Sequence, residues 1–457
     1  MTQATTDPIK LVPLRSPFDV AIAPPGSKSL TNRALLLAAL AEGTSTLSGV
    51  LLADDTRRML EALEALGFNL TLNEAELTVT VEGSGGQIPA DTAQLMLGNA
   101  GTAVRFLTAA LCLGEGPYTV DGIARMRERP IGQLVEPLRE LGAEIKYVEN
   151  AGFPPLTIQG IEPDPMEALS GGNSVAPDPM AALSGGNSIA LEPTLSSQFI
   201  SALLQIGACL VDGLELTFEG KITSLPYVKM TLNLMEKFGC ETARDKGYRA
   251  VRVRGRGYTA CDYAVEPDAS NATYFLAAAA ATPGARVQIP GLGSESLQGD
   301  AEFCDVLGRM GCDVTQRLRD TVVSAPADGY LQAVEVDLND MPDTAQTLAV
   351  LALFAEGTTL IRNVGNLRVK ETDRLAALET ELTKLGAVVN ITGDDIAVTP
   401  PFDGKLTPAA IDTYDDHRMA MSFAVAGLRS PGVTINDPDC VNKTYPGFWS
   451  DLERLRS

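Results

Sequence analysis

The sequence predicts an α/β protein of two domains, with apolar helices inside and sheets facing solvent. The chain has 457 residues, of which 45% are hydrophobic, and a chain of this length exceeds what one hydrophobic core usually serves. A five-residue segment recurs along the chain, as in Leu63–Gly67: its first and fourth residues are apolar and its fifth is glycine. A second kind of segment recurs with it, which would form a helix with apolar residues on all its faces. The recurrence of both segments indicates repeated structural units.

The recurring glycines mark the ends of amphipathic helices, because a glycine at the C′ position commonly ends a helix. The five segments are Leu63–Gly67, Leu138–Gly142, Met235–Gly239, Leu307–Gly311 and Leu382–Gly386, and a sixth helix without a glycine covers Leu452–Leu455. The interval between the glycines is nearly constant except between Gly142 and Gly239. There, residues 163–176 are followed by a near-identical copy, residues 177–190. We interpret this duplication as a tolerated surface hairpin, with a specialised loop before Ser196 as the alternative.

The second recurring segments are expected to be buried helices, because a helix that is apolar on all sides has no face for solvent. They cover Arg33–Leu40, Ala103–Leu113, Phe199–Leu210, Ala272–Ala281, Ala345–Ala355 and Met419–Leu428. The strand-like segments that follow them, such as Tyr118–Val120 and Thr358–Ile361, must then lie outside. Six such units, divided evenly, give two domains of three units each.

Polar and basic residues collect where these helices begin. The starts are Pro25–Ser29, Gly98–Thr102, Ser196–Gln198, Asp268–Asn271, Pro342–Thr344 and Asp415–Arg418, and all six offer side chains typical of N-caps. The basic residues at these starts or in nearby loops are Lys28, Arg33, Arg105, Arg129, Lys370, Arg374, Arg418 and Lys443. Helix starts and arginine side chains both bind anions, so the sequence predicts a small ligand with several negative charges.

Composition excludes several other classes of function. A net charge of -22 disfavours nucleic-acid partners, whose binding requires a basic surface. The apolar stretch Ala34–Ala41 is too short to cross a bilayer, and residues 1–18 resemble neither a secretion nor an import signal, so we expect a cytoplasmic protein without a membrane partner. The seven cysteines include no Cys-x-x-Cys pair, which argues against a disulfide framework and a zinc site.

Segments from about residue 20 to the C-terminus resemble the 5-enolpyruvylshikimate-3-phosphate synthase family, in order and in detail. They are PGSKSLTNRALLLAAL, LGNAGTAVRFL, RMRERPIGQLVEPLRELGA, LSSQFISALL, MPDTAQTLAVLALFAEG, NLRVKETDRL, DDHRMAMSFAVAGL and NKTYP. The resemblance implies a two-domain inside-out α/β barrel of six repeated units, with one domain formed by 1–23 plus 267–457 and the other by 24–266. It also implies a monomer that transfers the enolpyruvyl group of phosphoenolpyruvate to the 5-hydroxyl of shikimate 3-phosphate, releasing phosphate, without a metal or organic cofactor. This reaction belongs to the route to chorismate and the aromatic amino acids.

The resemblance further assigns residues to each role. Shikimate 3-phosphate would contact Lys28, Ser29, Arg33, Ser196, Ser197, Gln198, Ser224, Tyr227, Asp343, Asn366 and Lys370. Phosphoenolpyruvate would contact Lys28, Asn99, Gly101, Arg129, Gln198, Arg374, Arg418 and Lys443. The catalytic groups would be Asp343, Glu371, Lys28 and Lys370, with Asp343 as the base beside Lys370. Because these sets fall on both domains, domain closure over the substrates is expected. We interpret the single histidine, His417, as a structural residue at a helix start.

Phe106 departs from the family pattern, because many members that are sensitive to the inhibitor glyphosate have proline there. We expect reduced glyphosate sensitivity, although the retained Gly101 would admit the inhibitor. Two alternatives stay open. The sister transferase acting on UDP-N-acetylglucosamine usually has Lys-Asn in place of Lys28–Ser29, and its reactive cysteine motif is missing around residues 121–132. A non-catalytic binding protein of the same fold should have lost the four catalytic candidates, and this chain retains them.

Overall fold

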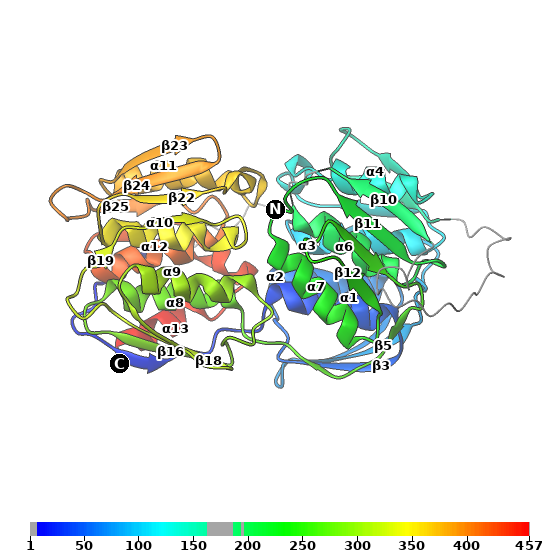
Figure 1. Ribbon diagram of the computed structural model, residues 1–457, viewed down its shortest axis with the longest axis horizontal. Coiled ribbons are helices and arrows are strands. Elements are labelled where there is room, and N and C mark those ends of the chain that lie inside the picture. The colour runs from blue at the N-terminus through cyan, green and yellow to red at the C-terminus, as the bar shows by residue number, and fades with distance from the viewer. Residues whose placement is uncertain (1–6, 162–185, 193–195, 457) are drawn as a thin grey trace. The chain divides into compact units, whose positions relative to one another are not determined.

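The computed structural model describes residues 7–161, 186–192 and 196–456. The chain divides into two compact units (Figure 1). We call Met1–Ser27 together with Glu266–Ser457 the terminal unit, and Lys28–Val265 the central unit. Most of the duplicated segment, residues 163–190, lies outside the described residues, so its predicted hairpin stays a prediction.

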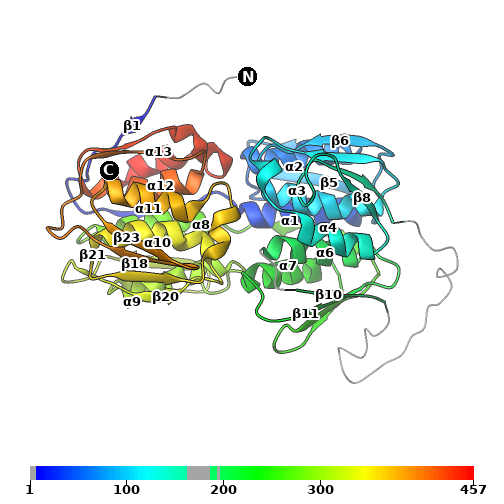
Figure 2. The same ribbon diagram turned by 90° about the horizontal axis from the view of Figure 1, so that it is seen from above.

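The core of each unit is built from helices that are buried on all sides. In the central unit these are α1 (Lys28–Leu40), α3 (Gly101–Ala110) and α6 (Ser197–Gly207). In the terminal unit they are α8 (Ala269–Ala281), α10 (Ala345–Leu351) and α12 (His417–Arg429), which run side by side in Figure 2. The predicted positions of the buried helices are therefore confirmed, although several begin a few residues earlier than their apolar runs.

Amphipathic helices alternate with the buried ones along the chain. They are α2 (Asp54–Ala65), α4 (Gly132–Glu140), α7 (Leu225–Lys237), α9 (Phe303–Arg309), α11 (Arg374–Lys384) and α13 (Phe448–Glu453). The glycines after the first five, Gly67, Gly142, Gly239, Gly311 and Gly386, have φ between 79° and 100°. A residue with a Cβ rarely adopts this left-handed conformation, so the predicted helix ends are confirmed.

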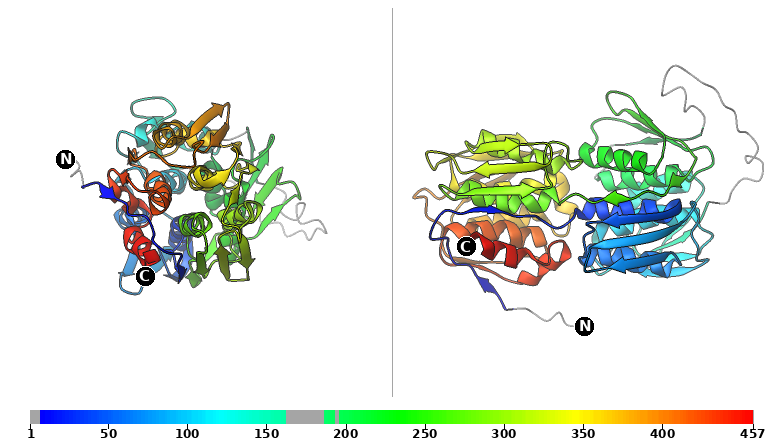
Figure 3. Two further views of the ribbon diagram at one scale, coloured as in Figure 1. Left: turned by 90° about the vertical axis from the view of Figure 1, so that its left-hand side faces the viewer. Right: turned by 90° about the horizontal axis from the view of Figure 1, so that it is seen from below.

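The sheets lie outside the helices, as the left view of Figure 3 shows for the terminal unit. The central unit has β3 (Ala41–Ser48), β4 (Asn69–Asn73) and β5 (Thr78–Ser84) with β14 (Tyr258–Thr259) and β15 (Tyr263–Ala264) in one sheet. Its second sheet contains β6 (Ala93–Met96), β7 (Tyr118–Asp121), β8 (Glu144–Tyr147) and β9 (Leu156–Gln159). The third contains β10 (Asn187–Leu191), β11 (Leu214–Phe218), β12 (Thr242–Arg244) and β13 (Ala250–Val253).

The terminal unit has sheets of similar construction. One contains β2 (Asp19–Ala21), β16 (Arg286–Pro290), β17 (Asp313–Gln316) and β18 (Asp320–Ser324). The next contains β20 (Glu335–Asp337), β22 (Thr359–Arg362), β23 (Val388–Thr392) and β24 (Asp395–Thr399). A third contains β1 (Ile9–Lys10), β25 (Ala409–Ile411) and β26 (Val433–Ile435), and β19 (Leu331–Gln332) pairs with β21 (Ala355–Glu356). Each sheet of three or more strands contains one strand that pairs in parallel with the neighbour on one side and antiparallel with the neighbour on the other.

The mixed α/β class with internal helices is confirmed, whereas the described residues show no closed barrel. Each sheet formed by the described residues has two edge strands, so none of them closes on itself. The strands are short, and alternate side chains such as Tyr118 and Val120 of β7 point to the helices. Several separate sheets cover the buried helices, so a continuous barrel is not required to shield them from solvent. No helix within the described ranges has the length and apolar character needed to cross a membrane.

Candidate active site

Arg33 contacts several of the elements that carry the candidate residues of the central unit. Its side chain is 1% exposed and lies among three helices. The guanidinium donates from Nε to Thr231 Oγ1 on α7 at 2.7 Å and from Nη2 to Ser201 Oγ on α6 at 3.1 Å. Its Nη1 donates to the carbonyl of Ser29 in the first turn of α1 at 2.9 Å. One buried cation thus joins the predicted shikimate 3-phosphate residues of α1 to two neighbouring helices.

These contacts also bring parts of several helices together. Arg33, Ser201 and Thr231 each lie one to two turns from the start of their own helix. Together with the ring of Tyr227, in the first turn of α7, they bring the N-terminal halves of α1, α6 and α7 together at Arg33. Helix α3 joins them, because the ring of Phe106, in its second turn, lies 5.0 Å from the Arg33 guanidinium. The first two turns of four helices are thereby gathered around one buried cation.

Burial lowers the pKa of Arg33 to about 10, and the nearby phenol of Tyr227 opposes this shift. The ring of Tyr227 lies 6.0 Å from the guanidinium. Arg33 therefore stays positively charged at neutral pH. Two hydroxyls, a carbonyl and two aromatic rings contact its guanidinium, so within the described residues its charge is not neutralised by an ion pair.

Asn99, Gly101 and Arg129 lie together at the start of α3. Arg129 is 3% exposed, and its Nη1 donates to Asn99 Oδ1 at 3.0 Å and to the Asn99 carbonyl at 3.2 Å. A Cβ added at Gly101 would lie 2.7 Å from Arg129 Nη2, so glycine allows the guanidinium to approach the helix start. The predicted N-cap at this helix is wrong: the N-cap residue is Ala100, and the Asn99 side chain accepts from Arg129 instead.

The other candidates of the central unit lie at the starts of α1, α6 and α7. Lys28 begins α1, and its Nζ lies 3.3 Å from Asp55 Oδ2, an ion-pair partner that sequence reasoning missed. Ser196 caps α6 by accepting from the Gln198 N–H at 3.2 Å, and Ser197 begins that helix. Ser224 precedes α7 with a left-handed φ of 56°, and its side chain makes no capping hydrogen bond to the helix.

Asp343 is the centre of the candidate residues in the terminal unit. It precedes α10 in a short 3₁₀ segment, Pro342–Thr344. Its Oδ2 lies 3.0 Å from Arg418 Nη2, and its Oδ1 lies 3.1 Å from Arg374 Nη1 and 3.6 Å from Lys370 Nζ. Three predicted substrate or catalytic cations therefore surround one predicted base.

Arg374 is itself held by two further carboxylates. Its Nε lies 2.7 Å from Asp416 Oδ2, and its Nη2 lies 2.9 Å from Glu371 Oε2. Asp416 is 0% exposed and also caps α12, accepting from the Arg418 N–H at 2.9 Å. The sequence predicts only a capping role for Asp416, within the segment Asp415–Arg418. Its second contact, with a residue far away in the sequence, had no local signal.

The ionisation of this cluster follows from its pairing. Burial raises the pKa of Asp343, but Arg418, Lys370 and Arg374 outweigh burial and hold the pKa well below its ordinary value. For Arg374, burial acts to lower the pKa, whereas Asp416, Glu371 and Asp343 together raise it above its ordinary value. Asp343 is therefore a carboxylate at neutral pH, and Arg374 is a cation.

Three remaining candidates lie in the terminal unit. Asn366 lies in the 3₁₀ segment Gly365–Val369, and its Oδ1 is buried with no hydrogen-bond partner among the residues that the structure describes. Lys443 ends the segment Pro438–Lys443, and the carbonyl of the next residue, Thr444, accepts from Asn271 in the first turn of α8 at 3.3 Å. His417 is the first residue of α12 and is 0% exposed.

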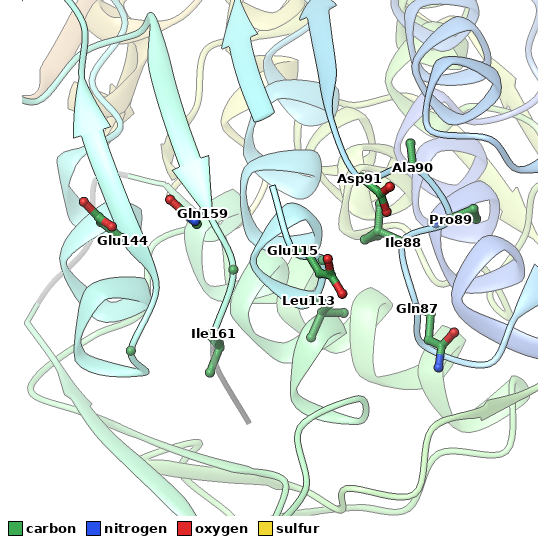
Figure 4. Close-up of a pocket in the computed structure, with 13 residues that line it drawn as sticks. Gln87, Ile88, Pro89, Ala90, Asp91, Leu113, Glu115, Glu144, Gln159 and Ile161 are labelled. Atoms are coloured by element: carbon green, nitrogen blue, oxygen red, sulfur yellow. The ribbon is translucent and has the colours of Figure 1, made fainter. Parts of the chain in front are cut away.

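A large cavity in the central unit lies elsewhere. Its volume is about 1010 Å³, and the carboxylates of Asp91, Glu115 and Glu144 contribute to its wall (Figure 4). None of the predicted substrate-binding residues lines this cavity. Because its charged side chains are acidic, it is unsuited to an anionic ligand. The helix starts, and not this cavity, are therefore the candidate active site.

Replacing Asp416 tests how far the cluster depends on it. Asp416→Ala should lower the free energy of unfolding of the terminal unit by roughly 3 kcal/mol, because Arg374 loses a buried partner and α12 loses its cap. Asp416→Asn keeps a capping oxygen and should cost less. Urea unfolding followed by fluorescence of Trp449, the single tryptophan, measures this. Asp415→Asn, at the exposed neighbouring position, is the control, and equal midpoints for Asp416→Ala and the parent chain would contradict the assignment.

Comparison with known proteins matches the whole chain to one family. The family model of EPSP synthase (3-phosphoshikimate 1-carboxyvinyltransferase) matches residues 14–452. A 3-phosphoshikimate 1-carboxyvinyltransferase of Shewanella denitrificans is 44% identical over 100% of this chain and 99% of the relative. One of Laribacter hongkongensis is 48% identical over 95% of this chain and 96% of the relative. The solved structure of EPSP synthase from Acinetobacter baumannii aligns with a TM-score of 0.76 at 25% identity, over 99% of this chain and 98% of that chain. The chain therefore belongs to the EPSP synthase family.

Proposed function

We propose that this chain transfers the enolpyruvyl group of phosphoenolpyruvate to the 5-hydroxyl of shikimate 3-phosphate and releases phosphate, on the route to chorismate. The observation that carries the proposal is the Asp343 carboxylate, held ionised among Lys370, Arg374 and Arg418. A base among cations suits a reaction that removes a hydroxyl proton between two polyanionic substrates. Family membership supports the same reaction.

The chemistry divides among the candidate residues as follows. Asp343 takes the proton of the 5-hydroxyl, whose oxygen attacks the substituted carbon of phosphoenolpyruvate. Lys28 and Glu371 donate and accept the proton that is added to the methylene carbon when the tetrahedral intermediate forms. The proton is removed again when phosphate leaves this intermediate. Lys370 lies beside Asp343 and stabilises its charge. No step in this sequence requires a metal or an organic cofactor.

Binding is divided in the same way. Arg33, with Ser29, Ser196, Ser197, Gln198, Ser224, Tyr227 and Asn366, binds shikimate 3-phosphate. Arg129, Arg374, Arg418 and Lys443, with Asn99 and Gly101, bind the carboxylate and phosphate of phosphoenolpyruvate. The central and terminal units act as the two functional domains, with boundaries near residues 24 and 266. We also propose that the chain works as a cytoplasmic monomer. The similar strand pairing of its sheets supports an origin in six repeated units.

Phosphate release from phosphoenolpyruvate should require shikimate 3-phosphate, and it is the direct test of the reaction. Asp343→Asn should lower kcat by about a hundredfold or more, because the base is lost while the shape is kept. Asp340→Asn, at an exposed position nearby, should leave kcat unchanged and is the matched control. If the folded parent chain released no phosphate with both substrates present, the proposed function would be wrong.

Gly101→Ala should raise the KM for phosphoenolpyruvate by about tenfold and change the KM for shikimate 3-phosphate little. The added methyl would lie 2.7 Å from Arg129 Nη2, so the guanidinium must move from its present position. Gly132→Ala is the matched control, because Gly132 also begins a helix and the nearest atom to its added Cβ is 3.5 Å away. Equal KM values for Gly101→Ala and the parent chain would contradict the role given to Gly101.

We also propose that Phe106 reduces glyphosate sensitivity. Its ring is 0% exposed and lies against the Arg33 guanidinium, so it is part of the packing between α1 and α3. A proline at this position could not supply that contact. The ratio of the glyphosate inhibition constant to the KM for phosphoenolpyruvate should be at least about tenfold higher than in a sensitive family member with proline. Equal ratios would show that Phe106 has no such effect.

A further inference from the structure

Asp300 is a buried carboxyl group that the proposed mechanism does not use. It is 2% exposed and lies in the 3₁₀ segment Gly299–Glu302, which packs against α8. The hydroxyl of Ser270, in the first turn of α8, donates a short hydrogen bond to Asp300 Oδ2. Gln298 anchors the segment, because its Oε1 accepts from the Ala269 N–H at 3.0 Å and its Nε2 donates to the Pro267 carbonyl at 2.7 Å. The carboxyl is thus fixed at the start of a buried helix.

Helix α8 connects Asp300 to the cluster around Asp343. Ser270 and Tyr274 are four residues apart and share one face of the helix. The Tyr274 hydroxyl accepts from Arg418 Nη1 at 3.3 Å, and Arg418 Nη2 lies 3.0 Å from Asp343 Oδ2. The same helix face therefore holds Asp300 at one turn and the substrate-binding arginine at the next.

The surrounding charges make this carboxyl sensitive to pH in the neutral range. Burial, and then the negative charge of Asp343, raise the pKa of Asp300 to about 7, with Asp268 adding to the effect. The Ser270 hydroxyl and Arg418 oppose the shift. On the neighbouring helix α9, the charged residues Asp305 and Arg309 lie on its exposed side. Asp300 therefore gains its charge as the pH rises through neutrality.

We propose that Asp300 is a positioning residue that makes the binding of phosphoenolpyruvate at Arg418 depend on a proton. When Asp300 is neutral, the positive charge of Arg418 is available to the substrate anion. When Asp300 is ionised, its negative charge attracts Arg418 and repels the substrate anion. This inference rests on the proposed function, which assigns Arg418 to phosphoenolpyruvate. By linkage, anion binding favours protonated Asp300, so the affinity is highest at low pH and falls as the pH rises through about 7.

The test is the KM for phosphoenolpyruvate between pH 6 and pH 9, at saturating shikimate 3-phosphate, in the parent chain and in Asp300→Asn. The ratio of the parent KM to the Asp300→Asn KM should rise by at least about threefold from pH 6.5 to pH 8.5, because only the parent chain gains the negative charge. Titration of the substrate itself affects both proteins and cancels in this ratio. Glu302→Gln, an exposed change in the same segment, should follow the parent chain. A ratio that does not change with pH would overturn the inference.

A second variant keeps the test decisive if Asp300→Asn does not fold. Ser270→Ala removes a donor that stabilises the Asp300 carboxylate, so the rise in KM should move to higher pH. A rise at the same pH as in the parent chain would overturn the inference. The two proposals also fail in different ways. Absence of turnover in the parent chain refutes the proposed function, whereas turnover with parallel pH profiles refutes only the role of Asp300.

Discussion

The common direction of the buried helices is the constraint on which the rest of the structure depends. In the terminal unit, hydroxyl contacts link Thr273 on α8 to Thr347 on α10 at 3.0 Å, and Thr347 to Ser422 on α12 at 3.4 Å. Asp343, just before α10, pairs with Arg418, the second residue of α12, so the starts of these two helices lie at one end. Parallel helix dipoles packed side by side repel one another, and each start carries roughly half a positive charge. Anionic caps such as Asp268 and Asp416 relieve part of this repulsion, and an anionic ligand can relieve more.

The two units hold a buried arginine in different ways. In the central unit, hydroxyls, a carbonyl and aromatic rings surround Arg33, so its charge is solvated but not cancelled. In the terminal unit, carboxylates hold Arg374 on both sides of its guanidinium. An isolated buried charge is costly, and a bound phosphate would reduce that cost at Arg33 more than at Arg374. The central unit is therefore the better prepared of the two to attract an anion.

Local signals in the sequence predicted the helices but not the partners of their side chains. Helix ends such as Gly142 were predictable because a C′ glycine depends only on its own turn. The caps at Ser196, Asp268 and Asp416 were predictable for the same reason. Thr231 on Arg33 and Asp416 on Arg374 were not, because each pair is far apart in the chain and is joined only by packing. The barrel was inferred from the resemblance, and local patterning cannot decide whether a sheet closes on itself.

Charge balance around Asp343 bears on its proposed role as a base, because the pKa of its carboxylate is held low. Asp343, Glu371 and Asp416 face Lys370, Arg374 and Arg418, so three acidic side chains meet three basic ones before any ligand arrives. An anion that binds to Arg418 or Lys370 offsets part of the positive charge that holds the pKa of Asp343 low. The pKa of Asp343 then rises toward the range in which it accepts a proton efficiently. In the mechanism that we propose, Asp343 therefore becomes a stronger base when the substrates bind, and the same cations contribute to binding and to activation.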